Sequence, residues 1–333
     1  MWAPIAGLRR GNVAEIVSAL RRAQDWQLRG RTLALGRRTL VMGVVNITPD
    51  SFSDGGFFLD PAAAIAHGLA LLEEGADLLD LGSESTRPGS GAGPAARAES
   101  ALSADEEQTR LLPVLEGIVK QRPDAIVSVD TYKAATSQAA LEAGAAIIND
   151  VSGFRWDADM AAVCARADCG VVLMHTRGTP AEWGAQSKLT PDDLLATIRE
   201  GLQASLALAD AAGVAPEAIV LDPGYGFGKR GEENFTLLAR QAELLALGRP
   251  LLAGVSRKSF LGRALAALHE GQAAPVDQRE TASVAAMVAA ILNGAAVVRV
   301  HRVRAAVEAA LIADRIVEQM KGRETIADSG QPA

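Results

Sequence analysis

Eight short runs of apolar residues recur along the chain from residue 41 onward, and a longer amphipathic stretch separates each run from the next. The runs are rich in Val, Ile and Leu, and polar residues or glycines bound each of them. This alternation is typical of repeated βα units, in which a buried strand is followed by a helix that packs against the sheet. We expect the strands at 41–45, 78–81, 125–129, 146–148, 171–174, 218–221, 251–255 and 295–300.

Polar residues follow almost every run, and their positions distinguish two architectures. Eight βα units match the size of a (β/α)8 barrel, although an open doubly wound sheet gives a similar alternation. In a barrel the carboxyl ends of all the strands meet on one face, where active sites are built, whereas an open sheet scatters the outer ones. We therefore predict the α/β class with a single (β/α)8 TIM barrel. The polar positions are Asn46, Glu84 to Arg87, Asp130, Asn149, Asp150, His175, Asp222, Ser256 to Lys258, Arg299 and His301.

Several of the intervening stretches open with the chemistry of a helix start. Asp60-Pro61 and Thr190-Pro191 place a capping side chain before a first-turn proline, and Ser103 with Glu106 has the spacing of a capping box. These patterns predict helices that begin at 61, 104 and 191.

The two ends of the chain lie outside the predicted barrel, which we expect to span 28–321. Residues 12–25 have amphipathic spacing and predict a short extra helix within an N-terminal extension, 1–27. The segment 322–333 is expected to be a disordered tail.

Composition limits the partners. With 49% hydrophobic residues the chain can bury a sizeable core, and its net charge of -7 argues against nucleic acid and against acidic membrane surfaces. We expect small-molecule partners instead. The overall field opposes an anionic substrate, so a local cluster of Arg and Lys must attract it.

Cysteine usage and hydropathy bear on the compartment. Cys164 and Cys169 form neither a disulfide framework nor a zinc pattern and are expected to be core thiols. No secretory segment is evident, so we expect a cytoplasmic protein. The most apolar stretch, 281–298, is interrupted by polar residues and predicts a buried helix followed by a strand rather than a membrane span.

Acidic and amide groups end three of the predicted strands, at Asp130, Asn149 and Asp222. Such groups on one barrel face suit a flat heterocycle that presents amino and ring N–H donors. Paired carboxylates also serve as the acid and base of glycosidases or as magnesium ligands. Only 4% of the residues are aromatic, which leaves few rings to stack on sugars and counts against a glycosidase.

Basic groups follow the last two strands, in Ser256-Arg257-Lys258 and Arg299-Val300-His301-Arg302. This is the usual location of a phosphate site in a barrel. After the first strand, residues 46–56 are rich in small and polar side chains and are expected to close over a site. After the second, Arg87 stands between a hydroxyl and a Pro-Gly turn and could grip an anion.

Taken together, these segments resemble the dihydropteroate synthase family over about residues 28–320, and the resemblance depends on their order. The segments are 42–56, 84–89, 128–130, 149–150, 174–175, 222–229, 256–258 and 299–301.

The resemblance implies a role for each matching residue. Asp130, Asn149 and Asp222 would bind the edge of a pterin ring, Lys258 would reach its carbonyl and ring nitrogen, and Arg299 would stack on its face. Thr86, Arg299 and His301 would contact phosphate oxygens, and Asn46 would help hold Mg2+ on the diphosphate. Residues Thr86, Arg87, Phe227 and Ser256 would line the p-aminobenzoate side. The catalytic set would be Lys258, Arg299, His301 and Asn46.

The implied reaction condenses 6-hydroxymethyl-7,8-dihydropterin diphosphate with p-aminobenzoate to give 7,8-dihydropteroate and pyrophosphate. Pyrophosphate would depart first and leave a pterin-stabilised cation for the arylamine to capture. The resemblance also implies a homodimer.

Three features depart from the family pattern. The connection at 90–102 is longer than usual, Arg302 stands where Asp is common, and the first 27 residues have no counterpart. They leave open a catalytically silent pterin-binding paralogue. A pterin-dependent methyltransferase domain is the other alternative, although it should lack the segments 85–88 and 299–301.

Overall fold

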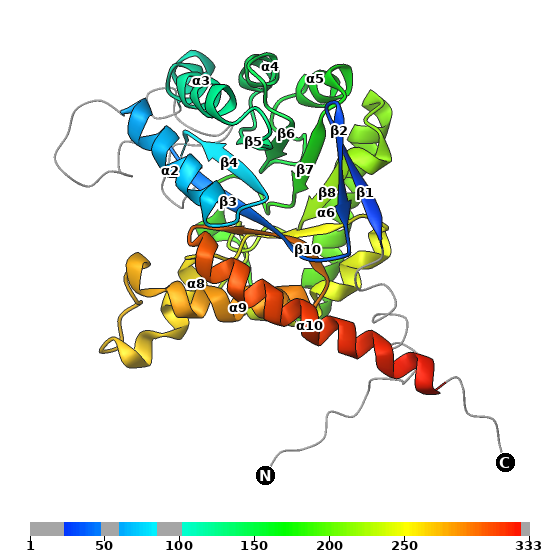
Figure 1. The fold of residues 1–333 in the computed structure, drawn as a ribbon. Helices are drawn as coiled ribbons and strands as arrows, with labels where there is room; N and C mark the ends of the chain where they lie inside the picture. The colour runs from blue at the N-terminus through cyan, green and yellow to red at the C-terminus, as the bar shows by residue number, and fades with distance from the viewer. Residues whose placement is uncertain (1–22, 48–59, 85–101, 328–333) are drawn as a thin grey trace, which may run out of the picture.

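The computed structural model describes residues 23–47, 60–84 and 102–327, with only the backbone of 321–327 (Figure 1). Each predicted run forms a strand, and the strands close into a parallel barrel in the order β10-β3-β4-β5-β6-β7-β8-β9. The open-sheet alternative is therefore wrong and the (β/α)8 barrel is confirmed. The barrel strands are β3 (Leu40–Asn46), β4 (Leu78–Gly82), β5 (Val127–Asp130), β6 (Ile147–Asp150), β7 (Gly170–Met174), β8 (Ile219–Asp222), β9 (Leu251–Ala253) and β10 (Ala295–Val300).

Helices surround the barrel; α10 packs beside α9, and its C-terminal end projects beyond the barrel (Figure 1). The α-helices are α2 (Pro61–Glu73), α3 (Ala104–Gln121), α4 (Ala134–Glu142), α5 (Met160–Ala167), α6 (Pro191–Ala212), α7 (Glu233–Arg240), α8 (Ser259–Ala264), α9 (Glu280–Leu292) and α10 (Val303–Ala327). The short 3-10 helices are η2 (Trp183–Ala185), η3 (Pro216–Ala218), η4 (Gln241–Leu247), η5 (Ala266–Leu268) and η6 (Val276–Gln278).

The predicted helix starts are confirmed. The Asp60 side chain accepts a hydrogen bond from the amide of Ala62 at the start of α2, and Thr190 accepts from that of Asp193 at the start of α6. At α3, Ser103 and Glu106 form both bonds of a capping box. Local side-chain chemistry therefore determines where these helices begin.

The barrel interior changes from apolar to polar toward the carboxyl ends of the strands. Alternate residues of a strand share a face. The inner face of β4 therefore carries Leu78 and then Asp80, and the inner face of β8 carries Val220 and then Asp222. Leu78 and Val220 belong to one buried apolar cluster inside the barrel, toward the amino ends of the strands. Leu79, on the outer face of β4, belongs to a second cluster that packs against the helices. The apolar layer closes one end of the barrel and leaves the polar layer at the other.

An antiparallel hairpin, β1 (Gln24–Leu28) and β2 (Arg31–Leu35), covers the apolar end of the barrel next to β7 and β8. Trp26 is fully buried, and its Nε1 donates to the Ala218 carbonyl at 2.8 Å. At Gly170, a Cβ atom would lie 2.4 Å from Leu28 Cδ2, so a larger residue there would displace the Leu28 side chain.

The hairpin corrects the C-terminal end of the helix predicted at 12–25. Residues 24 and 25 belong to β1, because Trp26 and Leu28 are buried on one side while Gln27 between them is exposed, which is the alternation of a strand. Residues 1–22 lie outside the described part of the chain. The expected boundary between the extension and the barrel, at 27/28, falls inside β1.

Near the C-terminus, α10 continues to Ala327, into the segment expected to be a tail from residue 322. No glycine or proline interrupts the sequence between Gly322 and Ala327, so the helix can continue there; residues 328–333 are outside the described part. The apolar stretch 281–298 forms α9 followed by β10, as predicted. Among the described helices, none is long and apolar enough to cross a bilayer.

Candidate functional site

The site is built on the polar layer at the carboxyl ends of the strands. Asn46, Gly82, Asp130 and Asn149 are consecutive partners in register across β3, β4, β5 and β6. Gly82 has no side chain, and a Cβ atom there would approach Asp130 Cβ to 3.4 Å. The three polar side chains therefore share one level, with space between them at Gly82.

Arg299 on β10 links two aspartates across this layer. Its Nε donates to Asp80 Oδ2 at 2.5 Å, and its Nη2 donates to Asp130 Oδ2 at 2.9 Å. The side chain of Arg299 is 20% exposed, whereas that of Asp80 is fully buried. Arg299 can therefore contact a ligand while both of its anchors remain in the barrel.

Asp80 has further partners. Its Oδ1 accepts from Ser128 Oγ at 2.7 Å, and its Oδ2 accepts from Asn149 Nδ2 at 3.0 Å. Together with Arg299, these contacts join residues of β4, β5, β6 and β10 in one hydrogen-bonded network. In a buried setting such a network rigidifies its members.

Asp130 titrates near neutrality. Burial is the largest effect and raises the pKa of Asp130 to about 7, although the Arg299 guanidinium acts in the opposite direction. Its carboxyl group can therefore change between donor and acceptor around neutral pH.

Asp222 begins a tightly held turn after β8. Its Oδ1 accepts from the Gly224 amide at 2.7 Å. Gly224 has a φ of +73°, and a Cβ atom there would lie 2.0 Å from the His175 carbonyl oxygen, so glycine is required. Lys229 donates to that same carbonyl at 2.8 Å. The turn 222–229 is thus tied to the end of β7.

Two buried basic groups beside this turn lose proton affinity. Burial lowers the pKa of His175 and of Lys229 well below their ordinary values. His175 Nδ1 has no hydrogen-bond partner among the described residues. With its imidazole neutral and only 3% of the residue exposed, His175 is better suited to packing under the site than to titrating in it.

Residues in the segments that follow β8, β9 and β10 complete the described site. The Lys258 ammonium lies 4.1 Å from the centre of the Phe227 ring. Next to them, Ser256 Oγ and His301 Nδ1 are 2.9 Å apart. This side of the barrel combines a cation held over an aromatic ring with a hydroxyl–imidazole pair.

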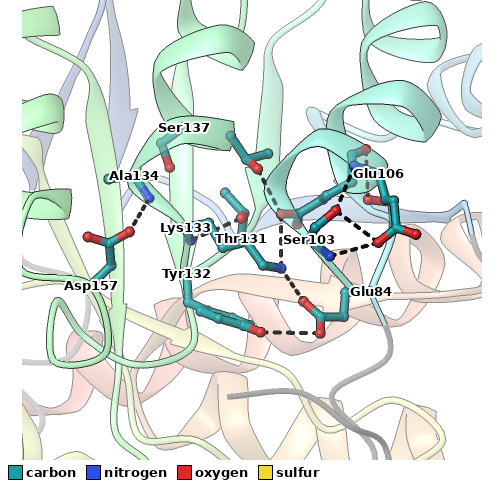
Figure 2. A network of polar contacts seen from close by, with 12 residues as sticks. Glu84, Ser103, Glu106, Thr131, Tyr132, Lys133, Ala134, Ser137 and Asp157 are labelled. Carbon is teal, nitrogen blue, oxygen red and sulfur yellow. Dashed lines mark hydrogen bonds and ion pairs between the residues drawn. The ribbon is translucent and has the colours of Figure 1, made fainter. Parts of the chain in front are cut away.

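A second network supports the end of β4 (Figure 2). Glu84 accepts from Lys133 Nζ at 2.5 Å and from the Tyr132 hydroxyl at 3.2 Å. Lys133 also donates to Glu107 Oε2 at 3.1 Å, and Thr136 donates to the same oxygen. Burial raises the pKa of Glu107. These bonds join β4 to α3 and to the start of α4.

The predicted site residues fall into two groups. Thr86, Arg87 and the loop 48–56 lie outside the described residues, as does the long connection except Leu102. The others lie at or just beyond the carboxyl ends of barrel strands, where Arg299 contacts Asp130, Lys258 contacts Phe227 and Ser256 contacts His301. The latter are Asn46, Asp130, Asn149, Asp222, Phe227, Ser256, Lys258, Arg299 and His301.

Sequence reasoning did not single out Asp80 and Lys229, although both support these residues. The sequence does contain an indication for Asp80, because it is a charged residue inside an apolar strand run. Such a residue is rarely buried without a partner. For Lys229 the sequence offers no indication beyond its position after three glycines.

Asn46, at the end of β3, is the predicted metal ligand. The described residues contain no group of three or more His, Cys, Asp or Glu that could hold an ion by themselves. Mg2+ prefers few protein ligands together with phosphate oxygens and water. A single half-buried amide oxygen therefore fits an ion delivered with a diphosphate, and this ligand stays a prediction.

Comparison with known proteins relates this geometry to a family. A family model described as pterin binding enzyme matches residues 42–301. A dihydropteroate synthase of Mycobacterium leprae is 46% identical over 269 residues, which are 81% of this chain and 90% of that protein.

Solved structures agree. The dihydropteroate synthase of Xanthomonas albilineans with 4-aminobenzoic acid has a TM-score of 0.75 and 40% identity, covering 89% of this chain and 98% of that one. The same enzyme in complex with 7,8-dihydropteroate has a TM-score of 0.72 and 38% identity, covering 87% and 98%.

Proposed function

The chain belongs to the pterin-binding enzyme family, among its dihydropteroate synthases, and we propose on that premise how its residues carry out the reaction. The barrel joins 6-hydroxymethyl-7,8-dihydropterin diphosphate to p-aminobenzoate and releases pyrophosphate. The observation that carries the residue assignments is the polar layer, in which carboxylates from β4 and β5 hold the Arg299 guanidinium and Asp80 also accepts a hydrogen bond from Asn149.

The pterin ring binds in this layer. Asp130, Asn149 and Asp222 accept hydrogen bonds from the amino and ring N–H groups along its edge. Lys258 donates to the ring carbonyl and a ring nitrogen, and Arg299 stacks on the ring face. A planar guanidinium held by two carboxylates, as Arg299 is, is well suited to stacking.

The diphosphate lies toward β10. His301, Arg299 and Thr86 contact its oxygens, and Ser256 keeps His301 oriented through their hydrogen bond. Asn46 would hold Mg2+, and the bound ion would supply positive charge to the leaving group. Arg299 and His301 therefore serve both substrate binding and leaving-group stabilisation.

Catalysis is electrostatic. Cationic side chains stabilise the negative charge that builds on the departing pyrophosphate. The arylamine nitrogen captures the pterin cation that remains and then loses a proton to the released pyrophosphate or to solvent. Phe227 and Ser256, together with Thr86 and Arg87, line the p-aminobenzoate side. The reaction needs no covalent bond to the protein.

The proposal includes a cytoplasmic homodimer. Support for the compartment comes from the two buried free thiols, Cys164 and Cys169. Support for the dimer comes from α10, where Leu311, Ile312 and Ile316 are 58%, 65% and 43% exposed. Large apolar side chains grouped on one helix are typical of a protein interface.

Pyrophosphate release from the dihydropterin diphosphate, with Mg2+ and with or without p-aminobenzoate, tests the proposed reaction. We expect dihydropteroate to form and Lys258→Ala to lower kcat/KM by about 100-fold or more, since one charged hydrogen bond to the ring is lost. The control is Arg263→Ala, which removes an exposed cation from the helix after Lys258 and should retain wild-type activity.

Two results would contradict the proposal. Pterin binding without turnover would favour the catalytically silent paralogue. A Lys258→Ala variant that is as active as Arg263→Ala would remove Lys258 from the site.

A further inference from the structure

We infer that Asp80, a buried residue in the middle of β4, is a positioning residue for ring recognition: it fixes which way the Asn149 amide faces and holds the plane of the Arg299 guanidinium. This inference rests on the proposed function, because it assigns Asn149 and Arg299 to a pterin ring. It adds a residue that sets the specificity of that site without touching the ligand.

Asp80 has the burial and the contacts that a positioning residue needs. The residue is fully buried, so it is shielded from bulk solvent, and it lies below Gly82 on the inner face of β4. Its two oxygens accept from three side chains, those of Ser128, Asn149 and Arg299, at 2.7, 3.0 and 2.5 Å. Each of these three donors therefore belongs to a different strand of the barrel, β5, β6 or β10.

The contact with Asn149 has a chemical consequence. A carboxylate only accepts hydrogen bonds, so the NH2 group of the amide must face Asp80. The amide oxygen of Asn149 is then left to accept from a ligand. Because the edge of a pterin ring presents amino and ring N–H donors, this orientation favours the ring. The flipped amide would instead place its NH2 group against those ring donors.

The contact with Arg299 fixes a plane. One carboxylate holds Nε and another, that of Asp130, holds Nη2. Two anchors on different atoms of a planar group stop it from rotating about its long axis, whereas Asp130 alone would permit that rotation. The face offered for stacking is therefore defined before a ligand arrives.

The variant Asp80→Asn tests the inference with little change in volume. Calorimetry would measure its affinity for 6-hydroxymethylpterin and for the 2-oxo analogue, which lacks the amino group. We expect pterin affinity to fall by about 10- to 100-fold and the preference for amino over oxo to shrink. A loss of packing alone would weaken both ligands equally.

The double variant Asp80→Asn/Asn149→Asp reverses the two groups. Its residue 80 can donate to a carboxylate at 149, so an acceptor faces the ligand again, and the number of acidic groups is unchanged. We expect it to bind the pterin about tenfold more tightly than Asp80→Asn. Partial recovery of the amino preference should accompany this gain.

Asp314→Asn is the matched control. Asp314 is also a buried aspartate, and it accepts from the backbone amide and hydroxyl of Thr39 at the other end of the barrel. This variant should lower the thermal midpoint and leave both affinities unchanged.

The outcomes separate the inference from the proposed function. If wild-type protein binds the pterin and Asp80→Asn shows the same affinity and preference, the inference fails while the function stands. A double variant that binds the pterin no more tightly than Asp80→Asn would also overturn it. If the wild-type chain itself does not bind the pterin, the proposed function fails first.

Discussion

At the scale of single residues, Asp130 is subject to opposing influences. Burial makes its charged form costly, whereas the neighbouring guanidinium of Arg299 favours that form, and the balance leaves a pKa of about 7. A protonated carboxyl donates a hydrogen bond, while an ionised one only accepts. Ligand recognition at this position should therefore depend on pH.

The affinity for 6-hydroxymethylpterin is expected to increase as the pH rises toward 7. A raised pKa means that the proton remains bound below about pH 7, so the acceptor form is lost as the pH falls, and affinity should drop about tenfold per unit there. Calorimetry across this range checks the slope. Asp130→Asn should bind weakly and without the slope, and a flat wild-type profile would contradict the assignment.

Functional residues that lie at the end of a strand were predictable from the sequence. Residues that act by holding other residues in place were not. Asn149 and Arg299 stand where a barrel collects functional groups, so their positions alone indicated a site. The role of Asp80 depends on partners at 128, 149 and 299. No local pattern reports which distant strands meet a buried carboxylate, so only the folded barrel could assign that role.

At the scale of elements, Lys133 joins helix to strand. It lies between Glu84, just after β4, and Glu107 on α3, and the side chains of Lys133 and Glu107 are 14% and 1% exposed. Removing the one cation would leave two carboxylates facing each other in a buried setting. The network in Figure 2 therefore makes α3 depend on the loop that starts α4.

Lys133→Met should cost about 3–5 kcal/mol of unfolding free energy, because a buried ion pair loses one partner. Urea denaturation measures this loss. The double variant Lys133→Met/Glu107→Gln should regain part of it by removing the stranded charge, whereas Lys120→Met, on the exposed face of α3, should scarcely change the transition. Equal transitions for Lys133→Met and Lys120→Met would contradict this role.

Elements were predictable in proportion to how local their determinants are. The caps at Asp60, Ser103 and Thr190 lie within a few residues of the helices that they begin. The hairpin at 24–35 was not predicted, because its strands are short and the surface that buries Trp26 comes from residues near 170 and 218. Amphipathic spacing upstream suggested a helix there instead.

At the scale of the whole molecule, the hairpin closes the apolar end of the barrel while chemistry occupies the other. Trp26→Ala should destabilise the chain by about 3–5 kcal/mol, since a fully buried aromatic ring and its hydrogen bond are removed. Thermal or urea denaturation checks this, with the exposed neighbour Gln27→Ala as control. Similar transitions for both variants would show that the hairpin contributes little to stability.

The proposed dimer is the second prediction at this scale. Ile312→Glu places a charge among the exposed apolar side chains of α10. It should convert the dimer to monomers in sedimentation experiments, because an unpaired charge buried in an interface opposes association. Leu268→Glu is the matched control, since Leu268 is 80% exposed on η5. A wild-type monomer, or a dimer that Ile312→Glu leaves intact, would refute this interface.

The hairpin also affects the order in which the chain can assemble during synthesis. Trp26 leaves the ribosome early, but the carbonyl that it contacts lies 192 residues further along the chain. At roughly 5–20 residues per second, that partner follows on the order of ten seconds or more later. The hairpin is therefore synthesised well before the part of the barrel on which it packs, and the apolar face that carries Trp26 and Leu28 reaches its native contacts only when β7, β8 and η3 have been made.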